Sequence, residues 1–303
     1  MDERQRKELE KLGGTNIHFA CPMDYYTTFR VGGKADALYL SPDLPSLKEI
    51  IAWLNREGLP YMTIGKGSNL LVRDEGFKGV MIILNKKLSA IEKNVENDRV
   101  IFAGGGLSVN RLMEYCRIYG LSGLEFLAGI PGTVGGAIAM NAGAFGKDIG
   151  SMVQEIHVIT NNGELIIQDR SDLRFAYREI LNLKGSVIVK ARFELDRERQ
   201  ELISERVAHY LKKRKETQPL EYPSGGSVFK NPPNDYAARL IEMVGLKGKK
   251  KGGAMISEKH ANFIVNTGGA KAEDILSLIN LAQKTVLAVT GIALEPEIRI
   301  VGN

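Results

Sequence analysis

A stretch of 21 residues without a charged side chain, residues 126–146, constrains the fold of this chain more than any other feature. It is long enough to cross a bilayer as a helix. However, it contains six glycines together with Pro131 and Asn141, which leave no continuous apolar surface to face lipid. We therefore interpret the stretch as buried, glycine-rich backbone of a soluble protein, and we expect no membrane insertion.

The composition is that of an ordinary globular protein. Apolar residues make up 44% of the 303 residues and charged residues 25%, which excludes a disordered chain, a collagen and a coiled-coil rod. The formal net charge of +5 suits an anionic ligand or loose contact with nucleic acid and selects neither. The two cysteines form no CxxC motif and the four histidines show no metal-ligand spacing, so we predict no metal site. Few cysteines, and a charged start without the apolar core of a secretion signal, predict a reducing, cytoplasmic setting.

Alternating helix and strand patterns occupy the first 120 residues. Apolar residues at helical spacing between 47 and 54, followed by Gly58, predict a helix whose polar side carries Trp53. A second helix is predicted to begin after Ser108 as its N-cap and to end at Gly120. Short apolar runs predict strands at 61–64, 80–84 and 100–103.

The later part of the chain changes character twice. Residues 153–195 are rich in strand patterns, and Asn162-Gly163 predicts a hairpin between the first two strands. After that, helices are predicted at 197–215, 236–244 and 272–289, and a final strand near 292–301. The last third therefore reads as an α/β unit of its own that begins near residue 198.

Two glycine-rich segments have the character of a nucleotide-binding backbone. The first, GKGSNLLV at 65–72, follows a predicted strand, and the second occupies 129–144. Glycine lets backbone N–H groups approach an anion closely and form anion-binding nests. Neither segment is a P-loop or a Rossmann fingerprint, since Leu70 stands where the third glycine of that fingerprint belongs. The pattern indicates either a large dinucleotide held by backbone or tight packing of helix on sheet, which also requires small residues.

Seven motifs in a fixed order resemble one known family. They are TTFRVGG (27–33), GKGSNLLV (65–72), GIPGTVGGAIAMNAGAFG (129–146), YR (177–178), SGGSVFKNP (224–232), ISEKHANFIVN (256–266) and LEPEIRIVG (294–302). Each motif alone is a weak signal, whereas the ordered set over residues 13–302 is specific. The chain resembles the UDP-N-acetylenolpyruvoylglucosamine reductase (MurB) family of peptidoglycan synthesis.

The resemblance implies an α+β fold and an oxidoreductase activity. The implied architecture is a two-subdomain FAD-binding fold of the vanillyl-alcohol-oxidase (PCMH) type, with a C-terminal α/β substrate-binding domain. On this basis we expect an FAD-binding domain at 1–197, with subdomains at about 1–90 and 91–197, and a substrate domain at 198–303. NADPH reduces FAD in this family, and the enolpyruvyl ether of UDP-N-acetylglucosamine is reduced to UDP-N-acetylmuramate. The implied partners are therefore the UDP-sugar nucleotide and NADPH, with no nucleic acid, and the protein is expected to be a monomer or weak oligomer.

The motifs also imply a set of site residues. The resemblance assigns catalysis to Arg178, Ser227 and Glu297. It assigns FAD contacts to Arg30, Gly65, Lys66, Gly67, Ser68, Asn69, Leu70, Gly129, Pro131, Gly132, Thr133, Gly135, Gly136, Asn141, Gly143 and Ala144. It assigns substrate contacts to Tyr177, Lys215, Lys230 and Asn231. One branch of the family inserts a tyrosine-bearing segment after the YR motif, but residues 179–192 leave no room for it here, so the chain is similar to the shorter branch.

The chemistry of the reaction agrees with the three catalytic residue types. Hydride addition to the alkene places negative charge beside the substrate carboxylate, and Arg178 offers a permanent cation for it. Ser227 can deliver the proton if the developing carbanion is more basic than the resulting alkoxide, with Lys230 as a candidate support. Glu297 either donates a hydrogen bond as an acid or orients Arg178.

Two other functions fit parts of the sequence. A different FAD enzyme of the same fold, with covalently attached flavin, would need His18 or Cys21 as the attachment residue, and neither lies in a flavin motif. A nucleic-acid binder would use the lysine-rich segments 212–215 and 246–251. Those segments lack the interleaved aromatic residues that such binders carry.

Overall fold

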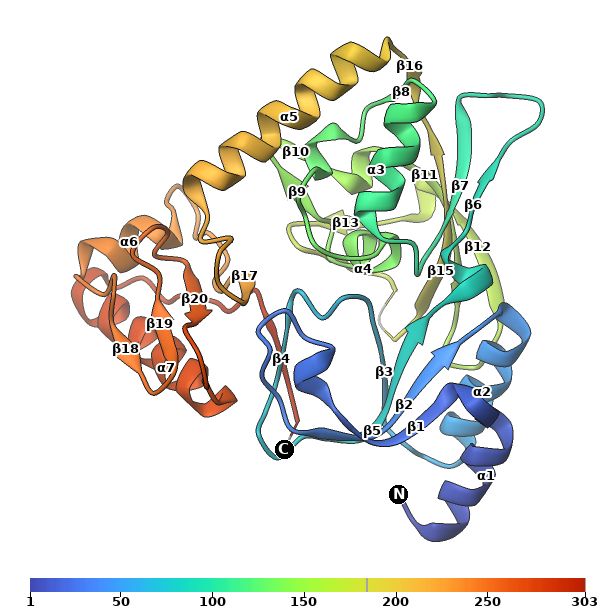
Figure 1. Cartoon of the computed structure of the whole chain (residues 1–303), viewed down its shortest axis with the longest axis horizontal. Helices are drawn as coiled ribbons and strands as arrows, with labels where there is room; N and C mark the ends of the chain where they lie inside the picture. The colour runs from blue at the N-terminus through green and yellow to red at the C-terminus, as the bar shows by residue number, and fades with distance from the viewer. Residues whose placement is uncertain (184, 303) are drawn as a thin grey trace. The chain divides into compact units, whose positions relative to one another are not determined.

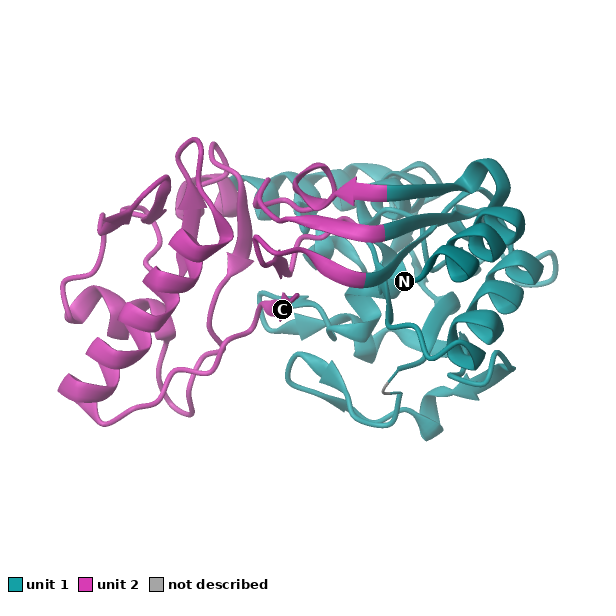
Figure 2. Ribbon diagram, turned by 90° about the horizontal axis from the view of Figure 1, so that it is seen from below, with its two compact units in different colours: residues 1–19, 37–65, 79–212 teal, residues 20–36, 66–78, 213–303 magenta. Residues whose placement is uncertain are grey.

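The computed structural model describes residues 1–183 and 185–302 (Figure 1). The chain forms two compact units, neither of which is continuous in sequence (Figure 2). Unit 1 comprises residues 1–19, 37–65 and 79–212, and unit 2 comprises residues 20–36, 66–78 and 213–303. Among the described residues, no helix combines the length and the apolar character needed to span a bilayer.

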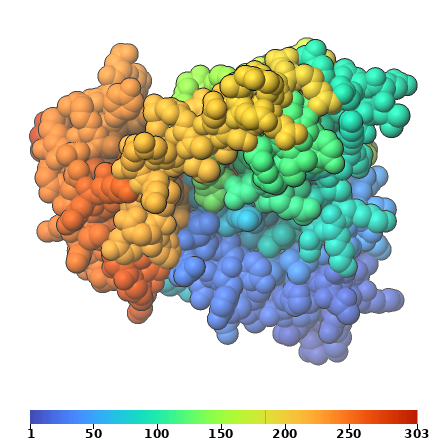
Figure 3. Space-filling view, turned by 45° about the horizontal axis from the view of Figure 1, so that its top comes forward, coloured from blue at the N-terminus to red at the C-terminus, as the bar shows by residue number. Residues whose placement is uncertain are grey.

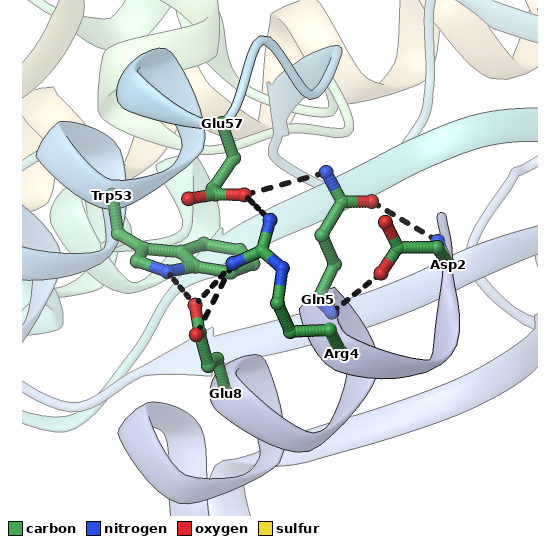
Figure 4. Close-up of polar contacts among 6 residues, drawn as sticks. All are labelled: Asp2, Arg4, Gln5, Glu8, Trp53 and Glu57. Atoms are coloured by element: carbon green, nitrogen blue, oxygen red, sulfur yellow. Dashed lines mark hydrogen bonds and ion pairs between the residues drawn. The ribbon is translucent and has the colours of Figure 1, made fainter.

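Unit 1 begins with two helices that bury the only tryptophan of the chain. Helix α1 (Glu3–Gly13) starts with a capping box between Asp2 and Gln5, and α2 (Leu44–Arg56) is capped by Asp43. The prediction that Trp53 lies on a polar surface is wrong, because its side chain is only 3% exposed. Its indole Nε1 donates to Glu8 of α1 at 3.0 Å, and Arg4 of the same helix pairs with Glu57 and Glu8 (Figure 4).

The first sheet has the strand order β1-β2-β5-β3. Its strands are β1 (Ile17–Pro22), β2 (Lys34–Ser41), β5 (Phe77–Leu84) and β3 (Tyr61–Ile64), and β3 pairs with β5 in parallel. The apolar face of α2, including Leu47, Ile50 and Leu54, belongs to one buried cluster with Val80 and Ile82 of β5. The predicted helix, its stop at Gly58 (φ +63°) and the predicted strands 61–64 and 80–84 are confirmed.

Another sheet lies wholly within unit 1 and is antiparallel throughout, in the order β12-β11-β15-β7-β6. Its strands are β12 (Leu165–Asp169), β11 (Val153–Ile159), β15 (Val187–Glu194), β7 (Val100–Gly104) and β6 (Ile91–Lys93). Helices α3 (Val109–Ile118) and α4 (Val134–Ala139) contribute to the buried cluster on this sheet. The hairpin predicted at Asn162-Gly163 is confirmed between β11 and β12, as is the predicted cap at Ser108, whose side chain accepts from the N–H of Arg111.

Short elements complete unit 1. Three pairs of two-residue strands are β8 (Leu121–Ser122) with β16 (Asp196–Arg197), β9 (Gly143–Ala144) with β10 (Lys147–Asp148), and β13 (Phe175–Ala176) with β14 (Glu179–Ile180). Single turns of 3-10 helix lie at Gly14–Asn16, Met23–Tyr25, Lys86–Ser89, Glu125–Leu127, Ile149–Ser151 and Arg170–Asp172, the second of them in unit 2. Helix α5 (Gln200–Thr217) has residues in both units, and its gold band lies on the surface in Figure 3.

Unit 2 is built on an antiparallel sheet in the order β17-β20-β19-β18. Its strands are β17 (Ser224–Ser227), β20 (Phe263–Asn266), β19 (Ala254–Ile256) and β18 (Lys250–Lys251), and its helices are α6 (Ala237–Met243) and α7 (Ala272–Thr290). Strand β4 (Leu70–Val72) pairs in parallel with β21 (Arg299–Val301). The predicted final strand was too long, because Pro296 carries no N–H for a ladder and residues before Arg299 make only an isolated bridge.

Candidate active site

The second glycine-rich segment lies in unit 1, against the end of strand β7. The N–H of Val134 donates to Leu107 O and the N–H of Gly135 to Gly105 O, both at 2.8 Å. A Cβ on Gly135 would lie 2.9 Å from Ile188 O and 3.0 Å from Gly105 O. Gly135 is therefore required for close packing of the backbone, and its N–H group already has a partner within the protein.

Thr133 brings the two glycine-rich segments together within unit 1. It is the N-cap of α4, and its Oγ1 accepts from the N–H of Gly136 at 3.3 Å. A Cβ on Gly65 would lie 2.5 Å from this same Oγ1, so only glycine allows the contact. Pro131 and Gly136 are exposed, and Gly129, Gly132, Gly65 and Thr133 are partly exposed. These small, accessible residues fit a bulky dinucleotide such as FAD, because they present backbone rather than side chains.

Arg178 stands at the tip of the hairpin between β13 and β14 with a left-handed backbone, φ +63°. Its Nη1 donates to Gly143 O at 3.3 Å, so the structure places Arg178 beside the glycine-rich segment. Its guanidinium carbon lies 5.2 Å from the ring centre of Tyr177, whose side chain is exposed. The predicted residues Arg178, Tyr177, Gly143 and Ala144 are thus neighbours in unit 1.

Asn141 is buried and holds this hairpin in place. Its Nδ2 donates to Ala176 O, and its Oδ1 accepts from the N–H of Gly150, both at 3.0 Å. The side-chain amide thus uses both of its polar atoms inside the protein. Its bond to Ala176 lies one residue before Tyr177 and two before Arg178. We had predicted a flavin contact for Asn141; the structure gives it a supporting position, and the flavin contact stays a prediction.

The first glycine-rich loop continues into unit 2 and connects to the segment of Glu297. Gly67 has φ +60°, and a Cβ there would lie 2.1 Å from Tyr26 O. The side chain of Asn69 donates from Nδ2 to Glu297 O at 3.1 Å, and its main-chain carbonyl accepts from the N–H of Arg299 at 2.9 Å. The loop predicted to bind the cofactor therefore also fixes the backbone at a predicted catalytic residue. Of its other predicted contacts, Lys66 and Arg30 are exposed, Ser68 is partly exposed and Leu70 is buried.

Ser227 and Glu297 lie on two paired segments of unit 2. The N–H of Glu297 donates to Val228 O at 2.7 Å, and that of Lys230 donates to Glu295 O at 2.9 Å. Phe229 and Pro296 form the antiparallel bridge between these bonds. The side chains of Ser227 and Glu297 are partly exposed, so the structure brings these two predicted catalytic residues to one accessible region of the unit.

Of the three remaining predicted substrate contacts, the side chains of two interact with other residues of unit 2 in the structure. Lys230 forms an ion pair with Glu295 at 2.6 Å. Asn231 accepts at Oδ1 from the N–H of Ala237, the first residue of α6, at 3.1 Å. Lys215 is exposed at the end of α5. Their contacts with a substrate stay predictions.

Sequence reasoning missed Asn262, which is 3% exposed and is bonded to the two residues that follow Ser227. Its side-chain amide makes two hydrogen bonds to the backbone of Phe229, described below. The neighbouring His260 accepts at Nδ1 from the N–H of Asn262, and burial lowers the pKa of this histidine. The ISEKHANFIVN motif contains both residues, but no periodicity in it reveals which backbone groups they contact.

Comparison with known proteins identifies both parts of the chain. Residues 218–301 match the family described as the C-terminal domain of UDP-N-acetylenolpyruvoylglucosamine reductase, and residues 39–168 match an FAD binding domain. The chain is 41% identical over 298 residues to the UDP-N-acetylenolpyruvoylglucosamine reductase of Caldanaerobacter subterraneus subsp. tengcongensis, covering 98% of this chain and 97% of that protein. It is 44% identical to the reductase of the same name from Alkalilimnicola ehrlichii, covering 93% of each.

A solved structure agrees with these matches. The crystal structure of UDP-N-acetylenolpyruvylglucosamine reductase (MurB) from Thermus caldophilus superposes with a TM-score of 0.81 at 35% identity, covering 93% of this chain and 97% of that one. The predicted α+β fold, with an FAD-binding part and a C-terminal substrate domain of this type, is confirmed. The chain belongs to the UDP-N-acetylenolpyruvoylglucosamine reductase family.

Proposed function

We propose that this chain is an FAD- and NADPH-dependent oxidoreductase that reduces UDP-N-acetylglucosamine enolpyruvate to UDP-N-acetylmuramate in peptidoglycan synthesis. Relatives that carry this reductase name match over nearly the full length. The observation that carries the proposal is the backbone pairing of the Ser227 segment with the Glu297 segment. This pairing holds the segment of a candidate proton donor beside the segment of a candidate carboxyl group.

The flavin would lie against small, accessible backbone. Bound FAD supplies the hydride, and NADPH supplies it to FAD. The contacts proposed for it are Arg30, residues 65–70, Gly129, residues 131–133, Gly135, Gly136, Asn141, Gly143 and Ala144. Of these, the exposed or partly exposed residues on either side of Thr133 fit best, because a ligand can reach their main chain.

Arg178 is proposed to stabilise the charge that develops beside the substrate carboxylate. A guanidinium can donate two parallel hydrogen bonds to a carboxylate. Its donation to Gly143 O and the anchoring of its hairpin by Asn141 hold it in one place before the substrate arrives. Loss of one such preorganised donor typically slows the chemical step by about 100- to 1000-fold.

Ser227 is proposed to donate the proton to the second alkene carbon, with Glu297 as hydrogen-bonding partner of the developing anion or as orienter of Arg178. Lys230 is the candidate that supports the resulting alkoxide, and its ion pair with Glu295 holds its ammonium near the segment. Tyr177, Lys215 and Asn231 are proposed to contact the sugar nucleotide. The division into an FAD-binding part at 1–197 and a substrate part at 198–303, a monomer or weak oligomer, and a cytoplasmic location belong to the same proposal.

The test separates the two halves of the reaction. Under anaerobic conditions NADPH should bleach the flavin of the purified protein, and the enolpyruvyl sugar nucleotide should then restore its colour. Ser227→Ala should bleach at the normal rate and recolour only at a small residual rate, because hydride uptake by the flavin needs no proton from serine. Ser224→Ala, a change of the same type at the other end of β17, should behave like the unchanged protein. If the rate of bleaching by NADPH falls in Ser227→Ala as much as the rate of recolouring, the proton-donor role is contradicted. A flavin that never recolours in the unchanged protein would contradict the whole proposal.

The alternative FAD enzyme with covalent flavin is not favoured. Cys21 is buried, and burial raises the pKa of its thiol, which leaves little of the nucleophilic thiolate. Acid precipitation decides the point, because flavin that stays with the pellet would support a covalent link.

A further inference from the structure

The buried side-chain amide of Asn262 makes both of its hydrogen bonds to the main chain of one residue, Phe229. Its Nδ2 donates to Phe229 O at 2.8 Å, and its Oδ1 accepts from the N–H of Phe229 at 2.9 Å. The main-chain carbonyl of Asn262 accepts from the N–H of Val228 at 2.8 Å. The planar side chain thus imitates a peptide unit of a neighbouring strand, since it offers one donor and one acceptor side by side.

This clamp continues a ladder that ends at the proposed proton donor. Ser227 is the last residue of β17 and pairs with Phe263 of β20, directly after Asn262. Beyond Ser227 no further strand residue of β17 follows, and the amide of Asn262 provides the next pair of hydrogen bonds. On the other side, the same segment is bonded to residues 295–297. Residues 227–230 are therefore held from two sides.

The position of Ser227 depends on these bonds for a local reason. Gly226, just before it, has φ +75° and a Cβ there would meet no atom within 4 Å, whereas Gly225 is buried and packed against the ring of Phe29. Val228 and Phe229, just after it, are fully buried. Gly226 leaves open space directly before Ser227, so the bonds to the buried residues after Ser227 help to fix the direction of its hydroxyl.

We propose that Asn262 is a positioning residue for Ser227: its amide clamp on Phe229 sets where the hydroxyl of Ser227 meets the substrate. This inference rests on the function proposed above. Errors of about 1 Å in the placement of a reacting group cost on the order of 100-fold in rate. We therefore expect loss of the clamp to slow flavin recolouring by roughly 10- to 100-fold while NADPH bleaching stays within about threefold.

The main test uses Asn262→Asp, which keeps the shape and the acceptor and replaces the donor that faces Phe229 O. Asn262→Ser, whose hydroxyl can make one of the two bonds, serves if the first variant does not fold. The matched control is Asn266→Asp. Asn266 is a buried asparagine of β20 whose amide bonds Phe29 O and the N–H groups of Gly268 and Ala270 instead. The control should lose stability but recolour within about threefold of the unchanged protein.

Hydrogen exchange provides a readout that does not need turnover. In Asn262→Asp the amides of residues 227–231 should exchange at least about tenfold faster, and in Asn266→Asp they should not, because only the first variant removes a bond to this segment. Unchanged exchange in a folded Asn262→Asp protein would overturn the clamp.

A double variant separates positioning of Ser227 from general damage. If Asn262 acts through Ser227, adding Asn262→Asp to Ser227→Ala should slow recolouring by less than about threefold further, since effects within one unit are not additive. Multiplication of the two effects, or equal slowing of bleaching and recolouring, would overturn the inference. If the unchanged protein never recolours, the proposed function fails; if it recolours and Asn262→Asp matches it, only this inference fails.

Discussion

The backbone at Arg178 predicts that a residue proposed to act in catalysis costs stability. At φ +63° the residue lies in the left-handed region, which costs an ordinary L-residue about 1–2 kcal/mol and asparagine or glycine much less. Strain of this kind collects at functional sites, where surrounding structure enforces it. Arg178→Ala keeps the strain, whereas Arg178→Asn relieves most of it. Both remove the guanidinium, with its bond to Gly143 and its contact with Tyr177.

The comparison between the two variants therefore isolates the backbone term. We expect Arg178→Asn to exceed Arg178→Ala in free energy of unfolding by about 1 kcal/mol, measured by denaturant unfolding with unchanged slope. Both should recolour the flavin about 100- to 1000-fold more slowly than the unchanged protein. Asn234, exposed at φ +62°, calibrates the strain in the same chain: Asn234→Ala should lose about 1 kcal/mol and keep its activity.

Two results would refute this reasoning. Equal stabilities of the Arg178→Ala and Arg178→Asn proteins, together with a loss in Asn234→Ala, would show that the hairpin relaxes and stores no strain at Arg178. Normal recolouring in Arg178→Ala would show that its guanidinium does not stabilise the developing charge.

Three further predictions concern other residues. Because burial lowers the pKa of His260, the unfolded chain binds its proton first as pH falls below about 6.5. The free energy of unfolding should therefore decrease from there toward the lower folded pKa, and less so in His260→Gln, as pH-dependent denaturation will show. Burial raises the pKa of Cys116 to about 12, and burial also raises the pKa of Cys21. Because both thiols are buried, a bulky disulfide reagent at pH 8 should label them only after denaturation. Gly135→Ala should destabilise the protein by about 1–3 kcal/mol whether or not flavin is bound, whereas Gly136→Ala should preserve stability and lower flavin retention, measured by ultrafiltration.

The sequence predicted those features whose cause lies within a few residues. Ser108 as a cap, Gly58 as a stop and the turn at Asn162-Gly163 depend on local hydrogen bonds and on backbone angles that glycine tolerates. The prediction for Trp53 is wrong because α1 covers its side chain, and we predicted no helix from the charged sequence of α1. A pattern read along one helix contains no information about which other helix covers it.

The same argument explains why the site was predicted only in part. The ordered motifs predicted Arg178, Ser227 and Glu297 as catalytic residues. The side chains that hold the segments of Arg178 and Ser227 are asparagines whose partners are backbone atoms. Asn141 bonds the hairpin of Arg178, and Asn262 bonds the segment of Ser227. A backbone partner has no side-chain identity, so it leaves no mark in the sequence, and only coordinates reveal the bond.

The glycines show most clearly what a motif cannot predict, because glycine is required both for close backbone packing and for backbone contact with a ligand. Gly135 is buried against two carbonyl oxygens, whereas Gly136, one position on, is exposed. Both stand in the same motif and both were assigned to the cofactor. A motif shared by a family preserves packing and binding together, since losing either one loses the activity. The distinction follows from exposure alone: a ligand can use only the backbone that the fold leaves accessible, so Gly136 is the position at which flavin contact can be separated from packing.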